Sequence, residues 1–315
     1  MFESFFEVPV GINDKDNCYF GSTNFNSPLL VYCHGAGRYI TDDKKLINLK
    51  SVIVDVAINV GYSVLVCNCM PKKFRDNNHL INDIPSCNAL SLESIYKAVS
   101  YVKNEIVKKD IPIFLYGDSM GGVTVVNLLV DNKISFKGAI MDCPIVSFQQ
   151  HLKFLSSYVD KLLETLLKTN VLLHFDPWRI FGKKFLCPIP VLFLLGKYDY
   201  LVDANITKAF VKDIKNKNVR LLEFNNCAHV CCDSKIKPYM LEKNILCNSA
   251  QLATLIFLQE NGGLNIKRIP FFEGCKRTID VGCIVKYYFY KFFRLKQLLF
   301  LYRKLILNRI CQKRN

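Results

Sequence analysis

The feature that most constrains the fold is an alternation of short apolar runs with longer amphipathic segments. Between residues 28 and 224 the apolar runs are "PLLVYC" (28–33), "YSVLVCN" (62–68), "IPIFLYG" (111–117), "FKGAIMDC" (136–143), "IPVLFLLG" (189–196) and "VRLLEF" (219–224). Runs of this length predict strands that are buried on both faces. In residues 90–109, apolar side chains recur every three or four positions after Ser91 and Glu93, which predicts an amphipathic helix. We therefore expect an α/β fold with a mostly parallel sheet, helices on both faces and ligands at the carboxyl ends of the strands.

Length and composition suit one large α/β domain with additions. The chain has 315 residues, 50% of them hydrophobic, and 14 cysteines. Its start, "MFESFFEVPVG", lacks a basic segment followed by a long apolar stretch, so we expect a cytoplasmic protein with reduced cysteines in its core. Cys67 with Cys69, or Cys231 with Cys232, could form half of a metal site, but no second pair stands at zinc-finger spacing. We expect neither a metal nor a cofactor.

The net charge of +15 is concentrated near the C-terminus. Residues 267–314 hold thirteen basic and two acidic residues, so the rest of the chain carries only about +4, and we expect no nucleic-acid partner. Residues 265–315 are also rich in aromatic side chains, and charges interrupt them too often for a membrane span. This tail predicts either a helix lying on an anionic membrane surface, as a peripheral anchor, or a helix docked on the protein itself or on a second copy.

One serine follows an apolar run directly and is surrounded by glycines, in "YGDSMGG" (116–122). Where a strand turns sharply into a helix, the corner residue adopts a strained conformation and its neighbours must be small. Gly117 and Gly121 provide that space and leave Ser119 at the tip of the turn. The pattern is that of a G-x-S-x-G nucleophile elbow, although a small serine in an ordinary tight turn would also satisfy it.

A serine nucleophile needs a base, and the base needs a carboxylate that orients it. His229, in "NNCAHVCC", follows the last apolar run, and Asp199, in "GKYDYLVD", follows the run before it. The chain order serine, aspartate, histidine is the one expected when a triad is assembled on such a sheet. Two alternatives stay open: Asp203 competes with Asp199 unless it caps the next helix, and His229 could be a surface-loop histidine.

The reaction also needs two N–H donors for the oxyanion. The segment "VYCHGAGRY" follows the first apolar run, and its glycines Gly35 and Gly37 let the backbone approach closely. The N–H of Ala36 is one candidate donor, and the N–H of Met120, directly after the serine, is the other. We expect His34 to organise this loop rather than to take part in catalysis.

Together, "HGAG", "GDSMGG", "GKYDYLV" and "AHV" resemble the motifs of the α/β-hydrolase superfamily over about residues 25–260. The combination is similar to that of monoacylglycerol lipases and of the serine aminopeptidase-like (S33-type) group, and "FDPW" (175–178) resembles esterases and acyl-peptidase-like members. "CNCMPKKFRDNN" departs from the Asp or Arg-Gly turn that many relatives carry after the second core strand. The resemblance implies an α/β-hydrolase fold, a triad and an oxyanion hole at these positions: Ser119, Asp199 and His229, with Ala36 and Met120.

We expect a hydrolase domain at residues 1–264, with a helical cap at about 145–187 that could instead be an ordinary crossover helix, and the basic tail at 265–315. The leading function is a serine hydrolase that cleaves a carboxylic ester through an acyl-serine intermediate. The apolar cap and basic tail favour a lipid-like or acyl ester as substrate. Two other functions stay open: a peptidase or amidase of the acylaminoacyl-peptidase kind, with Asp160 or Glu164 binding a free amino terminus, and a catalytically silent hydrolase fold that acts as a membrane interaction protein.

Overall fold

The structure is a computed structural model that describes part of the chain. The described residues are 6–8, 18–35, 52–67, 84–147, 150, 178, 189–214, 218–234, 237, 239–242, 245–266 and 288. The predicted cap and the predicted tail therefore lie almost entirely outside the described residues, and both stay predictions.

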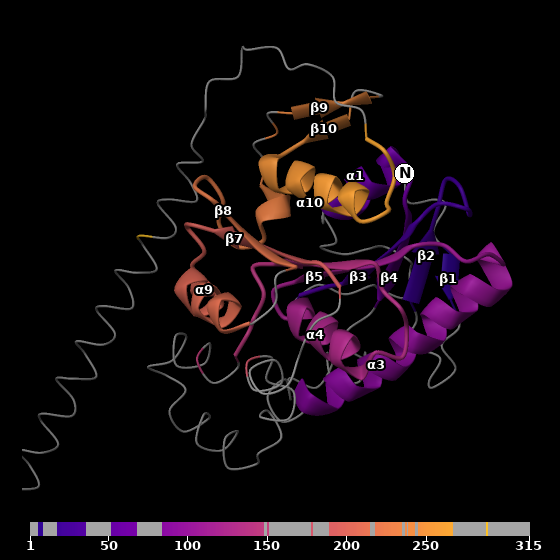
Figure 1. The fold of residues 1–315 in the computed structure, drawn as a ribbon, viewed down its shortest axis with the longest axis horizontal. Helices are drawn as coiled ribbons and strands as arrows, with labels where there is room; N and C mark the ends of the chain where they lie inside the picture. Colours follow the sequence, from indigo (N-terminus) through magenta and orange to yellow (C-terminus); the bar gives the residue numbers. More distant parts are fainter. Residues whose placement is uncertain are drawn as a thin grey trace, which may run out of the picture.

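The centre of the structure is an eight-stranded sheet with the strand order β1-β2-β4-β3-β5-β6-β7-β8 (Figure 1). Strands β3 to β8 pair in parallel, β1 pairs antiparallel with β2, and β2 pairs antiparallel with β4. The apolar runs of the sequence form the parallel strands, which confirms the α/β prediction. The bounds are β1 (Phe6–Val8), β2 (Cys18–Gly21), β3 (Leu29–Cys33), β4 (Ser63–Cys67), β5 (Ile113–Asp118), β6 (Gly138–Asp142), β7 (Val191–Gly196) and β8 (Val219–Phe224). A separate antiparallel pair consists of β9 (Tyr239–Leu241) and β10 (Ile245–Cys247).

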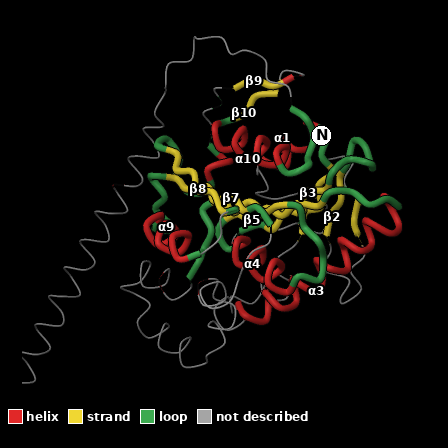
Figure 2. The backbone as a smooth tube through the Cα atoms, viewed as in Figure 1, coloured by secondary structure: helices red, strands yellow, loops and turns green. Residues whose placement is uncertain are grey.

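Helices cover both faces of this sheet (Figures 1 and 2). One face carries α1 (Val52–Val60) and α10 (Ser249–Glu260), and the other carries α3 (Ile84–Tyr101), α4 (Gly121–Asp131) and α9 (Ala204–Asp213). Every residue of the strands β3 to β7 is consequently buried. The prediction of a strand buried on both faces is wrong for β8, which lies at the edge of the sheet and has only intermediate and exposed residues. Successive side chains of a strand point to opposite faces, so Leu115 and Tyr116 enter the two separate hydrophobic cores.

The helix predicted for residues 90–109 begins earlier than expected. It starts at Ile84 and continues beyond Tyr101 as a π-helix from Val102 to Val107, which ends at Lys108 in a left-handed conformation (φ 55°). Glu93 therefore lies inside the helix rather than near its start, and it forms an ion pair with Lys97 one turn later (3.0 Å).

The topology brings the carboxyl ends of β3, β5, β6 and β7 to one edge of the sheet. The segments that follow these strands begin with His34, Ser119, Cys143 and Lys197. They contain most of the residues that the sequence singled out. Among the helices that the structure describes, none has both the length and the apolar character of a membrane span.

Candidate active site

Ser119 occupies a sharp turn between β5 and α4. Its φ is 50°, a left-handed value that is uncommon for a residue with a side chain. A Cβ on Gly117 would lie 2.6 Å from the carbonyl oxygen of Gly121, and a Cβ on Gly121 would overlap the carbonyl oxygen of Cys33. Only glycine fits at both positions, so the strand can turn into the helix here and leave the serine at the corner.

Backbone hydrogen bonds hold this turn against the end of β6. The N–H of Ser119 donates to the carbonyl oxygen of Asp142 (2.9 Å), and the N–H of Ile145 donates to the carbonyl oxygen of Ser119 (3.0 Å). Met120 follows as the N-cap residue of α4 and is half-buried. The candidate nucleophile thus lies on a rigid support at the N-terminus of a helix, where backbone N–H groups favour negative charge.

The loop after β3 approaches the serine closely. A Cβ on Gly35 would lie 2.9 Å from the Cβ of Ser119, so a larger residue at this position would displace the candidate nucleophile. His34 is fully buried, and its Nδ1 lies 2.9 Å from the carbonyl oxygen of Gly35, as expected of a loop organiser. Ala36 and Gly37 lie outside the described residues, so the predicted oxyanion donor at Ala36 stays a prediction.

Asp199 and His229 meet beyond the ends of β7 and β8. The Nδ1–H of His229 donates to Oδ2 of Asp199 at 2.9 Å. The other carboxylate oxygen of Asp199 accepts from the N–H groups of Leu201 and Val202, both at 2.9 Å, and the side chain is only 3% exposed. Because Nδ1 is bound to the carboxylate, Nε2 is the ring nitrogen left to accept a proton.

Asp203, the alternative acid, has a different role. Its side chain accepts from the N–H of Asn205 (2.9 Å) and caps the N-terminus of α9. The sequence favoured Asp199 because of its position after the strand and left Asp203 as the competitor, and the structure brings Asp199 to the histidine.

The surroundings of His229 stabilise its protonated form. Burial alone would lower its pKa, but the charge of Asp199 and the hydrogen bond to it, together with the more distant Asp118 and Asp142, raise the pKa above the ordinary 6.5. A neighbouring carboxylate that favours the imidazolium is what a general base requires when it removes the proton of a serine.

Cys143 lies between the turn at Ser119 and the Asp199–His229 pair. It follows Asp142, whose carbonyl oxygen binds Ser119, and its Sγ lies within 4.8 Å of ligand atoms of both Asp199 and His229. Its thiol also donates to the carbonyl oxygen of Ala228 (3.8 Å), next to His229. The turn at the end of β6 therefore contacts the backbone of Ser119 on one side and the Asp199–His229 pair on the other.

Two groups of possible metal ligands occur among the described residues. One comprises Asp142, Cys143 and Cys231, and the other comprises Cys143, Asp199 and His229, with ligand atoms within 4.8 Å of one another in each group. Burial raises the pKa of the Cys143 thiol to about 12. The carboxylates already accept hydrogen bonds from the loops around them. Asp142, Asp199 and His229 thus already have hydrogen-bond partners within the protein.

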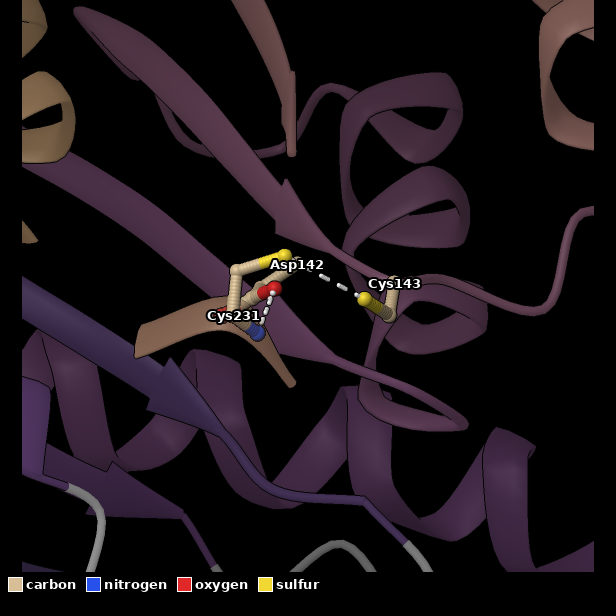
Figure 3. A group of neighbouring side chains, drawn as sticks. All are labelled: Asp142, Cys143 and Cys231. Atoms are coloured by element: carbon tan, nitrogen blue, oxygen red, sulfur yellow. Dashed lines mark hydrogen bonds between the residues drawn. The ribbon is translucent and has the colours of Figure 1, made fainter. Parts of the chain in front are cut away.

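Asp142 lies closer to the candidate site than its sequence context suggested. The sequence indicates only an acidic residue at the end of an apolar run, which is typical of a structural role. In the structure its buried carboxylate accepts hydrogen bonds from the segment after His229 (Figure 3). The one local signal was its position, a carboxylate at the carboxyl end of a central parallel strand.

The chain is similar to known hydrolases. A family model for the serine aminopeptidase family (S33) matches residues 87–180. No curated protein matches this chain in sequence. Among solved structures, a Pyrococcus furiosus esterase is 17% identical and superposes with a TM-score of 0.55 over 82% of this chain and 91% of its own. Esterase B of Lactobacillus rhamnosis is 13% identical and superposes with a TM-score of 0.56 over 82% of this chain and 85% of its own.

An acylaminoacyl peptidase of Pyrococcus horikoshii is similar to a smaller part of the chain. It is 15% identical, with a TM-score of 0.53, and the match covers 71% of this chain and 37% of that one. At identities this low, the structural likeness establishes the arrangement of the backbone but does not identify the substrate. The parallel sheet with helices on both faces, the family match and these likenesses together show that the chain has the α/β-hydrolase fold.

Proposed function

We propose that the protein is a serine hydrolase that cleaves a carboxylic ester, with Ser119, His229 and Asp199 as its triad. The hydrogen bond of 2.9 Å between His229 and Asp199, beside the strained turn at Ser119, is the observation that carries the proposal. A hydrolase fold without catalytic activity would not need a buried carboxylate hydrogen-bonded to the histidine.

In the proposed reaction Oγ of Ser119 attacks the ester carbonyl while Nε2 of His229 takes the hydroxyl proton. Asp199 stabilises the imidazolium, and the N–H groups of Met120 and Ala36 bind the oxyanion. The tetrahedral intermediate then collapses, the imidazolium protonates the leaving alkoxide as the ester C–O bond breaks, and an alcohol departs to leave the acyl-serine. A water molecule, deprotonated by His229, hydrolyses the acyl-serine and returns the enzyme with a free carboxylic acid.

The proposed substrate is a lipid-like or acyl ester, because the predicted cap is apolar and the predicted tail is basic and aromatic. The tail would hold the enzyme peripherally at an anionic membrane surface. A peptidase or amidase of the acylaminoacyl-peptidase kind is the second candidate, supported by the structural likeness to an enzyme of that name. Both reactions form an acyl-serine, so the triad does not distinguish them.

A fluorophosphonate probe tests the nucleophile directly. We expect covalent labelling at Ser119 that is abolished in Ser119→Ala. Folded protein that is not labelled would refute the proposal and favour the interaction protein. A series of p-nitrophenyl esters of increasing acyl length, compared with acylaminoacyl p-nitroanilides, then separates the two hydrolase candidates. Strict preference for the acetate ester would count against a lipid-like substrate.

A further inference from the structure

The segment that follows His229 has an unfavourable backbone conformation. Val230 has φ 59° and ψ 90°, and a β-branched residue in this region is an outlier. Such a conformation persists only where the surrounding structure over-determines it. The next residues, Cys231 to Asp233, form one turn of 3-10 helix. The contacts of this turn therefore fix the backbone directly after His229.

The buried carboxylate of Asp142 holds the N–H side of this turn. Oδ1 accepts from the N–H of Cys231 (2.7 Å), and Oδ2 accepts from the N–H of Cys232 (2.9 Å) and from the hydroxyl of Tyr116 (2.7 Å). Figure 3 shows the carboxylate facing Cys231, beside the contact of 3.6 Å between the sulfur atoms of Cys143 and Cys231. Asp142 itself is fully buried, at the end of a central strand.

The N-terminus of α10 holds the carbonyl side of the same turn. The side-chain amide of Asn248 donates to the carbonyl oxygens of Cys231 (3.2 Å) and Cys232 (3.0 Å). The amide of Gln251 also donates to the carbonyl oxygen of Cys232 (2.7 Å). Asn248 and Gln251 form the capping box of α10 and are both buried. The turn is thus fixed from two directions, by β6 and by a helix end.

We propose that Asp142 is a positioning residue for His229, acting through the turn at Cys231 and Cys232 and maintaining the strained conformation of Val230. The inference rests on the proposed function, because positioning matters only if His229 is the base. A carboxylate is suited to this place since its two oxygens accept from three donors at once. An asparagine has the same shape but presents one oxygen and one NH₂ group, so at least one N–H of the turn would face another donor.

The test compares Asp142→Asn with Tyr116→Phe. We expect Asp142→Asn to lower kcat by about tenfold to 100-fold with KM little changed, because a shift of about 1 Å in a catalytic group has an effect of this size. Tyr116→Phe also removes a buried hydrogen bond of Asp142 but keeps both N–H contacts to the turn. It should lower Tm while retaining most of kcat. The proposal would be overturned if Asp142→Asn had a lower Tm but an unchanged kcat. It would also be overturned if Tyr116→Phe lowered kcat as much as Asp142→Asn does.

A second variant tests the link to Val230. Glycine adopts φ near 59° without the steric cost of a side chain, so Val230→Gly in the Asp142→Asn background should recover part of the lost kcat. The two effects would then be non-additive in a double-mutant cycle. Additive losses would refute a role for Asp142 in maintaining this conformation.

A spectroscopic measurement separates this proposal from the function on which it rests. The Nδ1–H of a histidine bound to a carboxylate gives a far-downfield proton NMR signal that needs no substrate. We expect a sharp signal from His229 in the parent and in Tyr116→Phe, and a broadened or shifted signal in Asp142→Asn. If the parent hydrolyses nothing but the signal changes as described, the proposed function fails and the positioning role stands. An unchanged signal in Asp142→Asn would overturn the positioning role whatever the activity.

Discussion

Replacement of Gly196 by alanine tests whether the loops that carry Asp199 and His229 must approach each other without a side chain between them. Gly196 ends β7, and its carbonyl oxygen accepts from the N–H of Asp199 (3.1 Å). A Cβ at this position would overlap the carbonyl oxygen of Ala228, the residue before His229, and would lie 2.9 Å from the carbonyl oxygen of Cys227. Since real Cβ contacts essentially never fall below 3.0 Å, the histidine loop would have to retreat by at least about 1 Å.

That displacement sets the expected size of the effect. A catalytic group misplaced by about 1 Å lowers the rate by roughly 100-fold, or about 2.7 kcal/mol of transition-state stabilisation. The loss should appear in kcat/KM for an ester substrate and in the rate of fluorophosphonate labelling, because both require the same activated serine. The fold should be retained, since the clash is confined to two loops at the edge of the sheet.

Gly138→Ala is the matched control. Gly138 begins β6, at the opposite end from Asp142, and a Cβ there would lie 3.1 Å from a ring carbon of Phe257, a side chain that can shift. This variant should lower Tm with little change in kcat/KM. The reasoning is refuted if folded Gly196→Ala labels and hydrolyses at the parent rate, or if both variants lose activity equally.

Three further outcomes are expected. The raised pKa of His229 means that the imidazole is still protonated at pH 6.5, so kcat/KM should decline as pH falls through a value above 6.5; an acid limb at or below 6.5 in the pH–rate profile would contradict this assignment. Asp203→Ala removes the N-cap of α9 and should cost about 1 kcal/mol in the free energy of unfolding, measured by urea denaturation, with kcat nearly unchanged, whereas a large loss of kcat would restore Asp203 as a candidate acid. Protein that includes residues 265–315 should float with anionic liposomes and a version ending at Leu264 should not; equal behaviour of the two would exclude the tail as a membrane anchor.

The six parallel strands could be predicted because each is a predominantly apolar run of five or six residues bounded by polar or turn-forming residues. The strands β1, β2, β9 and β10 have only three or four residues each, too few for a period to be recognised. Their pairing depends on partners that lie elsewhere in the chain. Tyr19 of β2, for example, pairs with Val66 of β4.

The residues of the candidate site also fall into two groups, those that a local sequence motif predicts and those that it does not. Ser119, Asp199 and His229 each follow a strand within a recognisable local motif, so the contact between Asp199 and His229 could be expected from the topology and these motifs. The role of Asp142 has no local signature, because the N–H groups that it binds lie 89 and 90 positions later in the chain. A side chain whose partners are backbone groups of a distant loop leaves no residue pattern in the sequence.

Backbone strain marks the site independently of any motif. Among the described residues, positive φ occurs at five positions other than glycine. Lys108 and Asn132 are helix C-caps, where a left-handed residue is common. Ser119, Cys143 and Val230 instead occupy the turns that surround the His229–Asp199 pair, and none of them is a glycine or asparagine that would relieve the conformation. A substitution to glycine could remove the strain at each of these three turns. Its presence there indicates that the orientation of these side chains and of the neighbouring imidazole matters more than local stability.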